Sequence, residues 1–191
     1  MAELGVRRSP ALLGREGVGL ILVDVQEAFR PVIDRFDPTV AACGLLAEGF
    51  GVLGRPVLVT EQYPKGLGHT VEEVSGRLPE GVAPIEKLRF SACGVESFDE
   101  ALEASGCSTW VVAGIETHVC VHQTVMDLLD RGYTTQVASD AVSSRDPANK
   151  ALALERMAAA GAGLTSSEMA LFEMLEVAGS PEFKAISKLV R

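Results

Sequence analysis

Short apolar runs alternate along this chain with segments in which apolar residues recur at helical spacing. The first run, Val18–Val23, is apolar throughout, which is typical of a strand buried on both faces of a sheet. Such alternation favours βαβ units and a parallel sheet covered by helices on both faces. We therefore predict a three-layer α/β/α fold with a six-stranded parallel sheet. The expected strands are residues 18–24, 55–60, 84–86, 109–114, 134–138 and 163–165.

Several expected helices begin with a capping residue followed by proline. The Asp or Ser side chain accepts from an otherwise unsatisfied N–H, and the fixed φ of proline suits the first helical position. Asp37–Pro38, Asp146–Pro147 and Ser180–Pro181 have this pattern, and their helices are expected to end near Leu53, Gly161 and Val190. Further helices are expected over residues 97–105 and from Ser166 or Ser167 to Leu175. The longest irregular stretch, residues 62–79, is a candidate lid or specificity loop.

Length and charge narrow the functional classes. The 191 residues, 47% of them hydrophobic, suit a single domain over residues 1–191, with residues 1–16 expected as a loosely ordered N-terminal extension. A net charge of −9, with 17 basic residues and no basic cluster, disfavours nucleic acid and anionic membranes, so a small molecule is the expected partner. We find no signal-peptide core and no stretch long enough to span a bilayer. A cytoplasmic location is expected, and a mitochondrial one stays open.

The run Val111–Val121 places a cysteine where a strand gives way to a helix. Gly114 marks the predicted turn, and helical spacing continues from Val121 to Gly132. With Thr117 as the N-cap, Cys120 lies in the first turn, where unsatisfied N–H groups and the helix dipole favour a thiolate. The alternative is that a cysteine is simply a small buried hydrophobe. We adopt that alternative for the other three cysteines, which are Cys43, Cys93 and Cys107.

Two ionisable residues also follow predicted strands. Asp24 ends the first apolar run, and Lys87 follows the short run at residues 84–86. Because ligands of open α/β sheets bind beyond the carboxyl ends of the strands, both face the expected crevice. Taken singly, a turn or capping role is the commoner one for an aspartate such as Asp24, and a solvated surface position is the default for Lys87.

The combination of Asp24, Lys87 and Cys120 resembles the isochorismatase-like cysteine hydrolases, which include nicotinamidases and N-carbamoylsarcosine amidases. The resemblance spans nearly the whole chain and implies a Rossmann-like sheet with the isochorismatase-like hydrolase fold. Four segments, in the same order, are similar to the isochorismatase domain-containing proteins. These segments are Thr60–Gly68, Gly114–Cys120, Asp140–Arg145 and Pro181–Lys188.

The resemblance implies a Cys-Asp-Lys triad that cleaves an amide-like C–N bond through a thioester. Cys120 is the implied nucleophile, Asp24 the proton carrier and Lys87 the positive charge that stabilises the thiolate. The implied oxyanion hole consists of the backbone N–H groups of Glu116 and Cys120. Relatives also hold the peptide bond before the Glu116 position in cis.

The chain departs from the nicotinamidases at their metal site. Their aspartate-x-histidine motif follows the second strand, where this chain has Glu61-Gln62-Tyr63, with Gln62 at the aspartate position. The histidines here, at positions 69, 118 and 122, form no pair at a convincing ligand spacing. We therefore expect no metal and no cofactor, which makes nicotinamide itself a poor candidate substrate.

Residues close to the three strand ends are candidates for a substrate pocket. Aromatic walls with one amide suit a small, flat or apolar carbonyl compound. Ordinary core packing explains Phe29 and Phe90 equally well. Isochorismate is less attractive, because acid catalysis on its vinyl ether would leave Cys120 without a role. The candidate pocket residues are Phe29, Gln62, Tyr63, Phe90 and His118.

Two other classes of function stay open. One is a catalytically silent family member that acts as an interaction protein, which the joint presence of all three triad residues disfavours. The other is a redox sensor based on Cys120, with Cys93 as a possible resolving partner in space. Family members usually associate, so a homodimer or tetramer is expected. Candidate interface residues, which otherwise cover the sheet, are Phe172, Leu175, Phe183 and Ile186.

Overall fold

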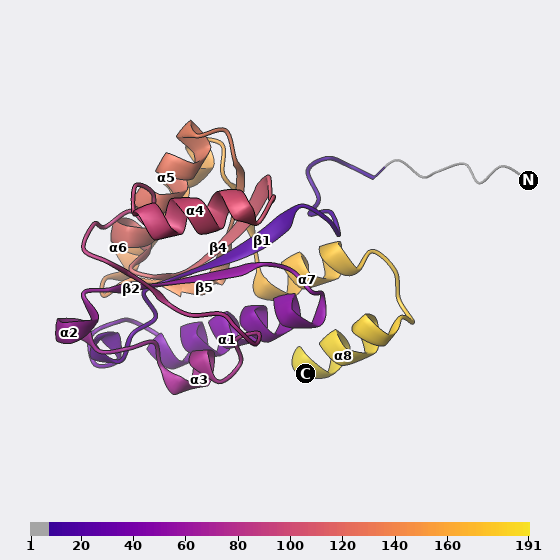
Figure 1. The fold of residues 1–191 in the computed structure, drawn as a ribbon, viewed down its shortest axis with the longest axis horizontal. Helices are drawn as coiled ribbons and strands as arrows, with labels where there is room; N and C mark the ends of the chain where they lie inside the picture. Colours follow the sequence, from indigo (N-terminus) through magenta and orange to yellow (C-terminus); the bar gives the residue numbers. More distant parts are fainter. Residues whose placement is uncertain (1–7) are drawn as a thin grey trace, which may run out of the picture.

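The computed structural model describes residues 8–191, and its core is one six-stranded, all-parallel sheet (Figure 1). The strand order is β3-β2-β1-β4-β5-β6, and every neighbouring pair is parallel. The three-layer α/β/α prediction is therefore confirmed. The strands are β1 (Val18–Val23), β2 (Val57–Gln62), β3 (Ile85–Lys87), β4 (Thr109–Ile115), β5 (Thr134–Ser143) and β6 (Gly163–Thr165).

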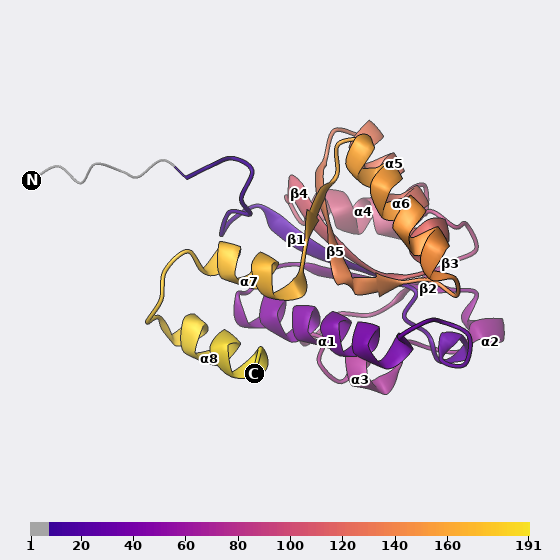
Figure 2. The ribbon, with the colours of Figure 1, turned by 180° about the vertical axis from the view of Figure 1, so that it is seen from behind.

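Helices cover both faces of the sheet and divide the core in two. Figures 1 and 2 show one group of helices above the sheet and the other below it. The first group comprises α4 (Glu96–Ala104), α5 (His122–Asp130) and α6 (Pro147–Ala159). The second comprises α1 (Phe36–Val52), α3 (Glu72–Ser75), α7 (Ser167–Leu175) and α8 (Pro181–Leu189). Because apolar residues of a two-sided strand alternate between faces, Ile21 packs with the first group and Leu20 and Leu22 with the second.

Three of the predicted caps are present, and two, at Asp37 and Thr117, are wrong. Asp146, Ser166 and Ser180 each accept a hydrogen bond from a backbone N–H of the helix that follows. Asp37 is not an N-cap, because α1 already begins at Phe36. Its carboxylate instead lies 2.9 Å from Arg30. The proline after it is tolerated because the first helical turn has no intrahelical partner for its N–H groups.

Residues 8–16 of the predicted extension make contacts with the rest of the chain, and the predicted lid contains helices. Residues 1–7 of the predicted extension lie outside the described residues. Within residues 8–16, the Arg8 guanidinium binds the Glu173 carbonyl, and the Leu13 N–H binds the Glu173 carboxylate at 2.8 Å. The segment 62–79 is not irregular throughout, because it contains α3 and α2 (Pro64–Leu67).

Two of the four candidate interface residues belong to the core. Leu175 and Ile186 are buried against the α1 side of the sheet. Phe172 and Phe183 pack edge to face at 6.2 Å, and both are partly exposed. Leu175 and Ile186 therefore cover the sheet. No helix among the described residues is long and apolar enough to cross a membrane.

Candidate active site

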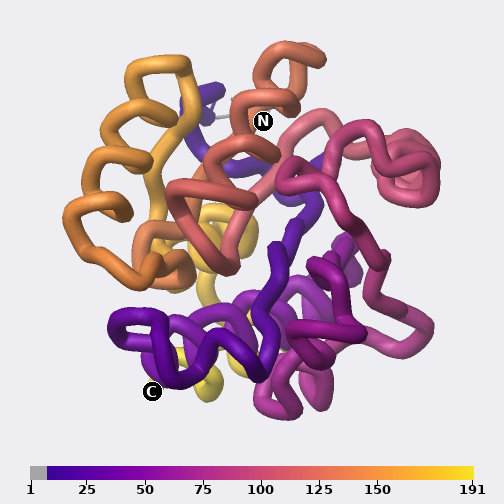
Figure 3. Tube along the Cα trace, turned by 90° about the vertical axis from the view of Figure 1, so that its left-hand side faces the viewer, coloured from indigo at the N-terminus to yellow at the C-terminus, as the bar shows by residue number. Residues whose placement is uncertain are grey.

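The sheet order brings together the three chain segments that follow β1, β2 and β4, at the carboxyl ends of these strands. β1 lies between β2 and β4, so the residues after β1 are adjacent to those after both neighbours. This is the point where the strand order reverses, at which open α/β sheets bind ligands. Figure 3 views the molecule from the side where α2 lies, with the loops that follow the strands toward the viewer.

A buried ion pair joins the ends of β1 and β3. Lys87 Nζ lies 2.6 Å from Asp24 Oδ2, and neither side chain is exposed to solvent. Thr60 of β2 donates its hydroxyl to Asp24 Oδ1 at 2.7 Å. Burial raises the pKa of Asp24, while Lys87 and Thr60 act in the opposite direction. The surface-lysine interpretation of Lys87 is therefore wrong, because the ammonium is enclosed by acceptors.

Four oxygens surround the Lys87 ammonium. Besides Asp24, they are Gln62 Oε1 at 2.8 Å and the carbonyls of Phe90 at 3.0 Å and Arg89 at 3.2 Å. An ammonium has three hydrogens, so this set saturates it. The loop after β3 thus curls around the lysine that ends the strand.

Cys120 completes the cluster from the far side of β1. It lies in the π-helical turn η2 (Thr117–Val121), which links β4 to α5. The thiol is close enough to Asp24 and Lys87 for both to shift its pKa. Burial and the Asp24 carboxylate raise the pKa of Cys120 to about 12, against a lowering by Lys87. A raised pKa favours the thiol, which is opposite in direction to the effect predicted for a helix start.

The backbone around the cluster is unusual at three points. Asp24 has a left-handed φ of 51°, which is rare for a residue with a Cβ. Gly114 has a φ of 122°, and a Cβ there would collide with the Val23 carbonyl oxygen. Gly114 lies within β4 rather than at the predicted turn. The Ile115–Glu116 peptide bond is cis, as the resemblance implies.

Thr117 is not the N-cap that the sequence predicts. Glu116 occupies the N-cap position of η2, and its side chain makes no cap hydrogen bond. Among the described residues, Thr117 Oγ1 is buried without a hydrogen-bond partner. The prediction fails because the chain enters α5 through a π-helical turn, which moves the start of the regular helix to His122.

Glu116 binds the loop after β5. Its buried carboxylate receives the Arg145 backbone N–H at 2.9 Å and the Arg145 Nη2 group at 2.6 Å. Burial alone raises the pKa of Glu116, but the bonds from Arg145 outweigh it and hold the pKa below its ordinary value. The pair fixes the turn that carries Cys120 to the β5–α6 connection.

A buried glutamine holds the segment after β2 in place. Gln26 Nε2 donates to the carbonyls of Gln62 at 3.0 Å and Gly68 at 2.6 Å, and its Oε1 accepts from the Gln62 N–H at 2.8 Å. Glu61 adds two bonds from Thr70. The candidate lid is thus pinned to the loop after β1.

The candidate pocket residues do not all meet. Phe29 packs against the α1 core cluster, which favours core packing. Gln62 contacts Lys87, and the His118 ring lies 3.0 Å from Ser144 Oγ. Tyr63 and Phe90 are 51% and 54% exposed, so they form a rim and not a closed wall.

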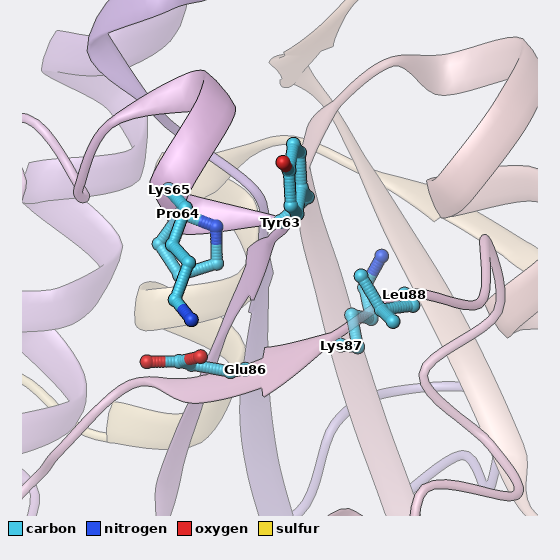
Figure 4. Close-up of a pocket in the computed structure, with 6 residues that line it drawn as sticks. All are labelled: Tyr63, Pro64, Lys65, Glu86, Lys87 and Leu88. Carbon is cyan, nitrogen blue, oxygen red and sulfur yellow. The ribbon is translucent and has the colours of Figure 1, made fainter.

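A cavity of about 310 Å³ lies beside this rim (Figure 4). Figure 4 shows Tyr63 and Pro64 on one side, with Glu86 of β3 and Leu88, which directly follows β3, on the other. Its lining includes Lys87 but neither Asp24 nor Cys120. The cavity therefore opens next to Lys87.

The expectation that this chain binds no metal stays a prediction. Two observations describe the candidate metal-ligating side chains. Across residues 8–191, no group of three His, Cys, Asp or Glu side chains gathers as ligands. Glu61 and His69 are hydrogen-bonded to each other at 3.0 Å, so these two groups already satisfy one another.

Sequence reasoning missed Thr60, Gln26 and Arg145 as parts of the site. Gln26 lies two positions after Asp24, and Thr60 two positions before Gln62. Their closeness in sequence to these candidate site residues was the signal that could have found them. Arg145 ends one of the segments that carry the resemblance. Its pairing with Glu116, 29 positions away, had no local signal.

Comparison with known proteins identifies the family. The isochorismatase domain model matches residues 18–169. The chain belongs to the isochorismatase family. The secreted isochorismatase effector Isc1 of Phytophthora sojae is 41% identical over 90% of this chain and 83% of its own length. Isochorismatase domain-containing protein 1 of Danio rerio is 39% identical over 88% of this chain, which covers only 59% of that protein.

A solved structure has the same fold as this chain. The MAR1 ribonuclease of Caenorhabditis elegans superimposes with a TM-score of 0.89 and is 36% identical, covering 94% of this chain and 92% of that one. The similarity to the isochorismatase domain-containing proteins, predicted from four short segments, is therefore confirmed over most of the chain.

Proposed function

We propose that this isochorismatase-family hydrolase cleaves an amide-like C–N bond of a small molecule, with Cys120 as nucleophile. The observation that supports the proposal is the fully buried Lys87–Asp24 pair, at 2.6 Å, beside the Cys120 thiol. A buried carboxylate that is held in place next to a thiol is the arrangement that activates a nucleophile by proton transfer.

In the first step Cys120 Sγ bonds to the substrate carbonyl carbon while its proton passes to Asp24. The thiol must transfer this proton during attack, because its raised pKa leaves little thiolate at neutral pH. Burial also raises the pKa of Asp24, which makes the carboxylate a better proton acceptor. Lys87 keeps the carboxylate oriented and offsets the negative charge that develops on sulfur.

The tetrahedral intermediate then loses the amine. The C–N bond breaks, the nitrogen takes the proton from Asp24, and a thioester remains on Cys120. Water attacks the thioester as Asp24 accepts its proton, and the proton returns to sulfur as the C–S bond breaks. We assign oxyanion stabilisation to the backbone N–H groups of Glu116 and Cys120, on the basis of the resemblance.

The cavity beside Lys87 suits the distal part of the substrate. Its volume of about 310 Å³ and the exposed Tyr63 and Leu88 side chains fit a small, partly apolar compound. The chain's net charge of −9 disfavours a polyanion. RNA is nevertheless a required probe, because the nematode neighbour is named a ribonuclease.

Mass spectrometry of protein trapped with small amides, ureas and aldehydes tests the proposal. We expect an adduct on Cys120 and hydrolysis of at least one amide, both lost in Cys120→Ala and kept in the matched Cys107→Ala variant. Hydrolysis that survives Cys120→Ala, or equal labelling of Cys43, Cys93 and Cys107, would contradict it. Cleavage of RNA but of no amide would indicate the neighbour's chemistry instead.

The redox alternative has a separate test. That alternative expects oxidation to a disulfide between Cys93 and Cys120, which belong to the same core cluster, as does Cys107. Intact mass after mild peroxide, followed by peptide mapping, distinguishes such a pair from an unmodified hydrolase. A Cys93–Cys120 disulfide together with no turnover would favour the sensor.

A further inference from the structure

Gln62 is the contact of Lys87 that the proposed mechanism leaves without a role. The register of β2 and β3 places Gln62 opposite Lys87, and Glu61 opposite Glu86. Side chains alternate between the faces of a strand, so the two pairs point to opposite sides. Glu61 accordingly binds Thr70 and His69, away from the triad. On the face that carries Lys87, β2 therefore contributes the Gln62 amide and no carboxylate, so Asp24 is the carboxylate that contacts Lys87 there.

The amide of Gln62 has a defined orientation. Its Nε2 donates to the Leu88 carbonyl at 2.9 Å, which turns Oε1 toward Lys87 Nζ at 2.8 Å. The reverse orientation would face two donors, the amide N–H and the ammonium, toward each other. The backbone of Gln62 is held on both sides by Gln26. The Gln62 oxygen to which Lys87 donates is thus fixed before any substrate binds.

We propose that Gln62 is a positioning residue that ligates Lys87 through a neutral oxygen, so that Asp24 and Lys87 form a cluster without net charge before Cys120 gives up its proton. This inference rests on the proposed function. The ionisable groups that act on the Cys120 thiol are Asp24 from the end of β1 and Lys87 from β3. A carboxylate in place of Gln62 would add a negative charge on the ammonium that offsets the developing thiolate.

The pH dependence of Cys120 alkylation by iodoacetamide, read by peptide mapping, tests the proposal. In Gln62→Glu, which keeps an oxygen of the same reach, we expect the rising limb of the rate profile, between about pH 7 and 9, to move to higher pH by about one unit, which is about a tenfold lower rate at a given pH. In Gln62→Met, which loses the acceptor, we expect a smaller shift in the same direction, because one of the four oxygens that fix the ammonium beside Asp24 is lost. The matched control is Gln136→Met in β5, whose amide donates to the Ala11 carbonyl and which leaves the profile unchanged.

A Gln62→Glu profile that superimposes on that of the wild type, or one moved to lower pH, would overturn the proposal. A purely structural role would lower the denaturation midpoint without moving the pH profile, so thermal unfolding of each variant is measured alongside. If Gln62→Met does not fold, Gln62→Glu alone decides. The outcome is separable from that of the proposed function, because alkylation reports the thiol whether or not an amide is hydrolysed.

Discussion

At the residue scale, the Asp24–Lys87 pair is held by burial as much as by charge. A buried ion pair is costly to break on one side, because the remaining charge stays desolvated. Lys87→Met is therefore expected to lower the free energy of unfolding by about 3–5 kcal/mol. The double variant Lys87→Met/Asp24→Asn, which carries neither charge, is expected to recover part of that loss. Urea unfolding of both checks this, and a double variant less stable than the single one would contradict it.

The Glu116–Arg145 pair gives a pH-dependent contribution to stability. The pKa of Glu116 is held below its ordinary value, so its bonds contribute fully above the unfolded value of roughly 4.3 and are lost as pH falls through the folded value. Arg145→Met is expected to cost about 1–2 kcal/mol at pH 6.5, a modest figure because the Arg145 side chain is 64% exposed.

The same substitution is expected to cost less near pH 3.5, below the ordinary value of about 4.3, because without Arg145 burial favours the protonated Glu116 and the unpaired charge is removed. Urea unfolding at the two pH values measures the difference. An equal cost at both would show that Arg145 contributes by packing rather than by charge.

At the scale of elements, Gly114 allows β4 to lie against the end of β1. Gly114→Ala would add a Cβ that meets Val23 backbone and would require a φ of 122° from an alanine. The matched control is Gly161→Ala, which has a φ of 109° but open space around the Cβ. We expect about 1–2 kcal/mol for the control and a clearly larger loss for Gly114→Ala, measured by urea unfolding. Equal losses of stability in the two variants would mean that the positive φ, and not the close approach of Val23, requires glycine at position 114.

The segment that follows β2 is expected to depend on Gln26. Gln26→Met removes three hydrogen bonds of a buried amide and leaves the Gln62 N–H without its acceptor. We expect amide hydrogen exchange to become at least tenfold faster over residues 62–70 and to stay unchanged in α7. Exchange that rises equally in both regions would indicate global destabilisation instead of local opening.

At the scale of the whole molecule, association stays a prediction. The chain is expected to form a homodimer or tetramer, and sedimentation velocity at micromolar concentration measures the mass against 20.2 kDa for one copy. Leu175 and Ile186 no longer support this expectation, because they are buried within one chain. A single species of the monomer mass would contradict it.

The sequence was most informative where the signal is local. Apolar runs located all six strands, although β5 extends to Ser143 and not only to residue 138, and β2 begins after Pro56, which cannot donate to a sheet. Caps at Asp146, Ser166 and Ser180 depend on neighbours within three positions, and they were predicted correctly. Asp37 failed because α1 begins one residue earlier, at Phe36, and the Asp37 carboxylate pairs with Arg30 instead.

The sequence by itself determined the strands, most of the helices and the three strand-end residues Asp24, Lys87 and Cys120. It did so because periodicity and chain punctuation act over a few residues. Only the tertiary structure decided which oxygens surround the lysine, which amide pins the following segment and how far burial raises the thiol pKa. Those features depend on strand order and register, which bring residues 36 to 63 positions apart into contact. No local pattern specifies such a pairing, because its free energy exists only once the sheet has formed.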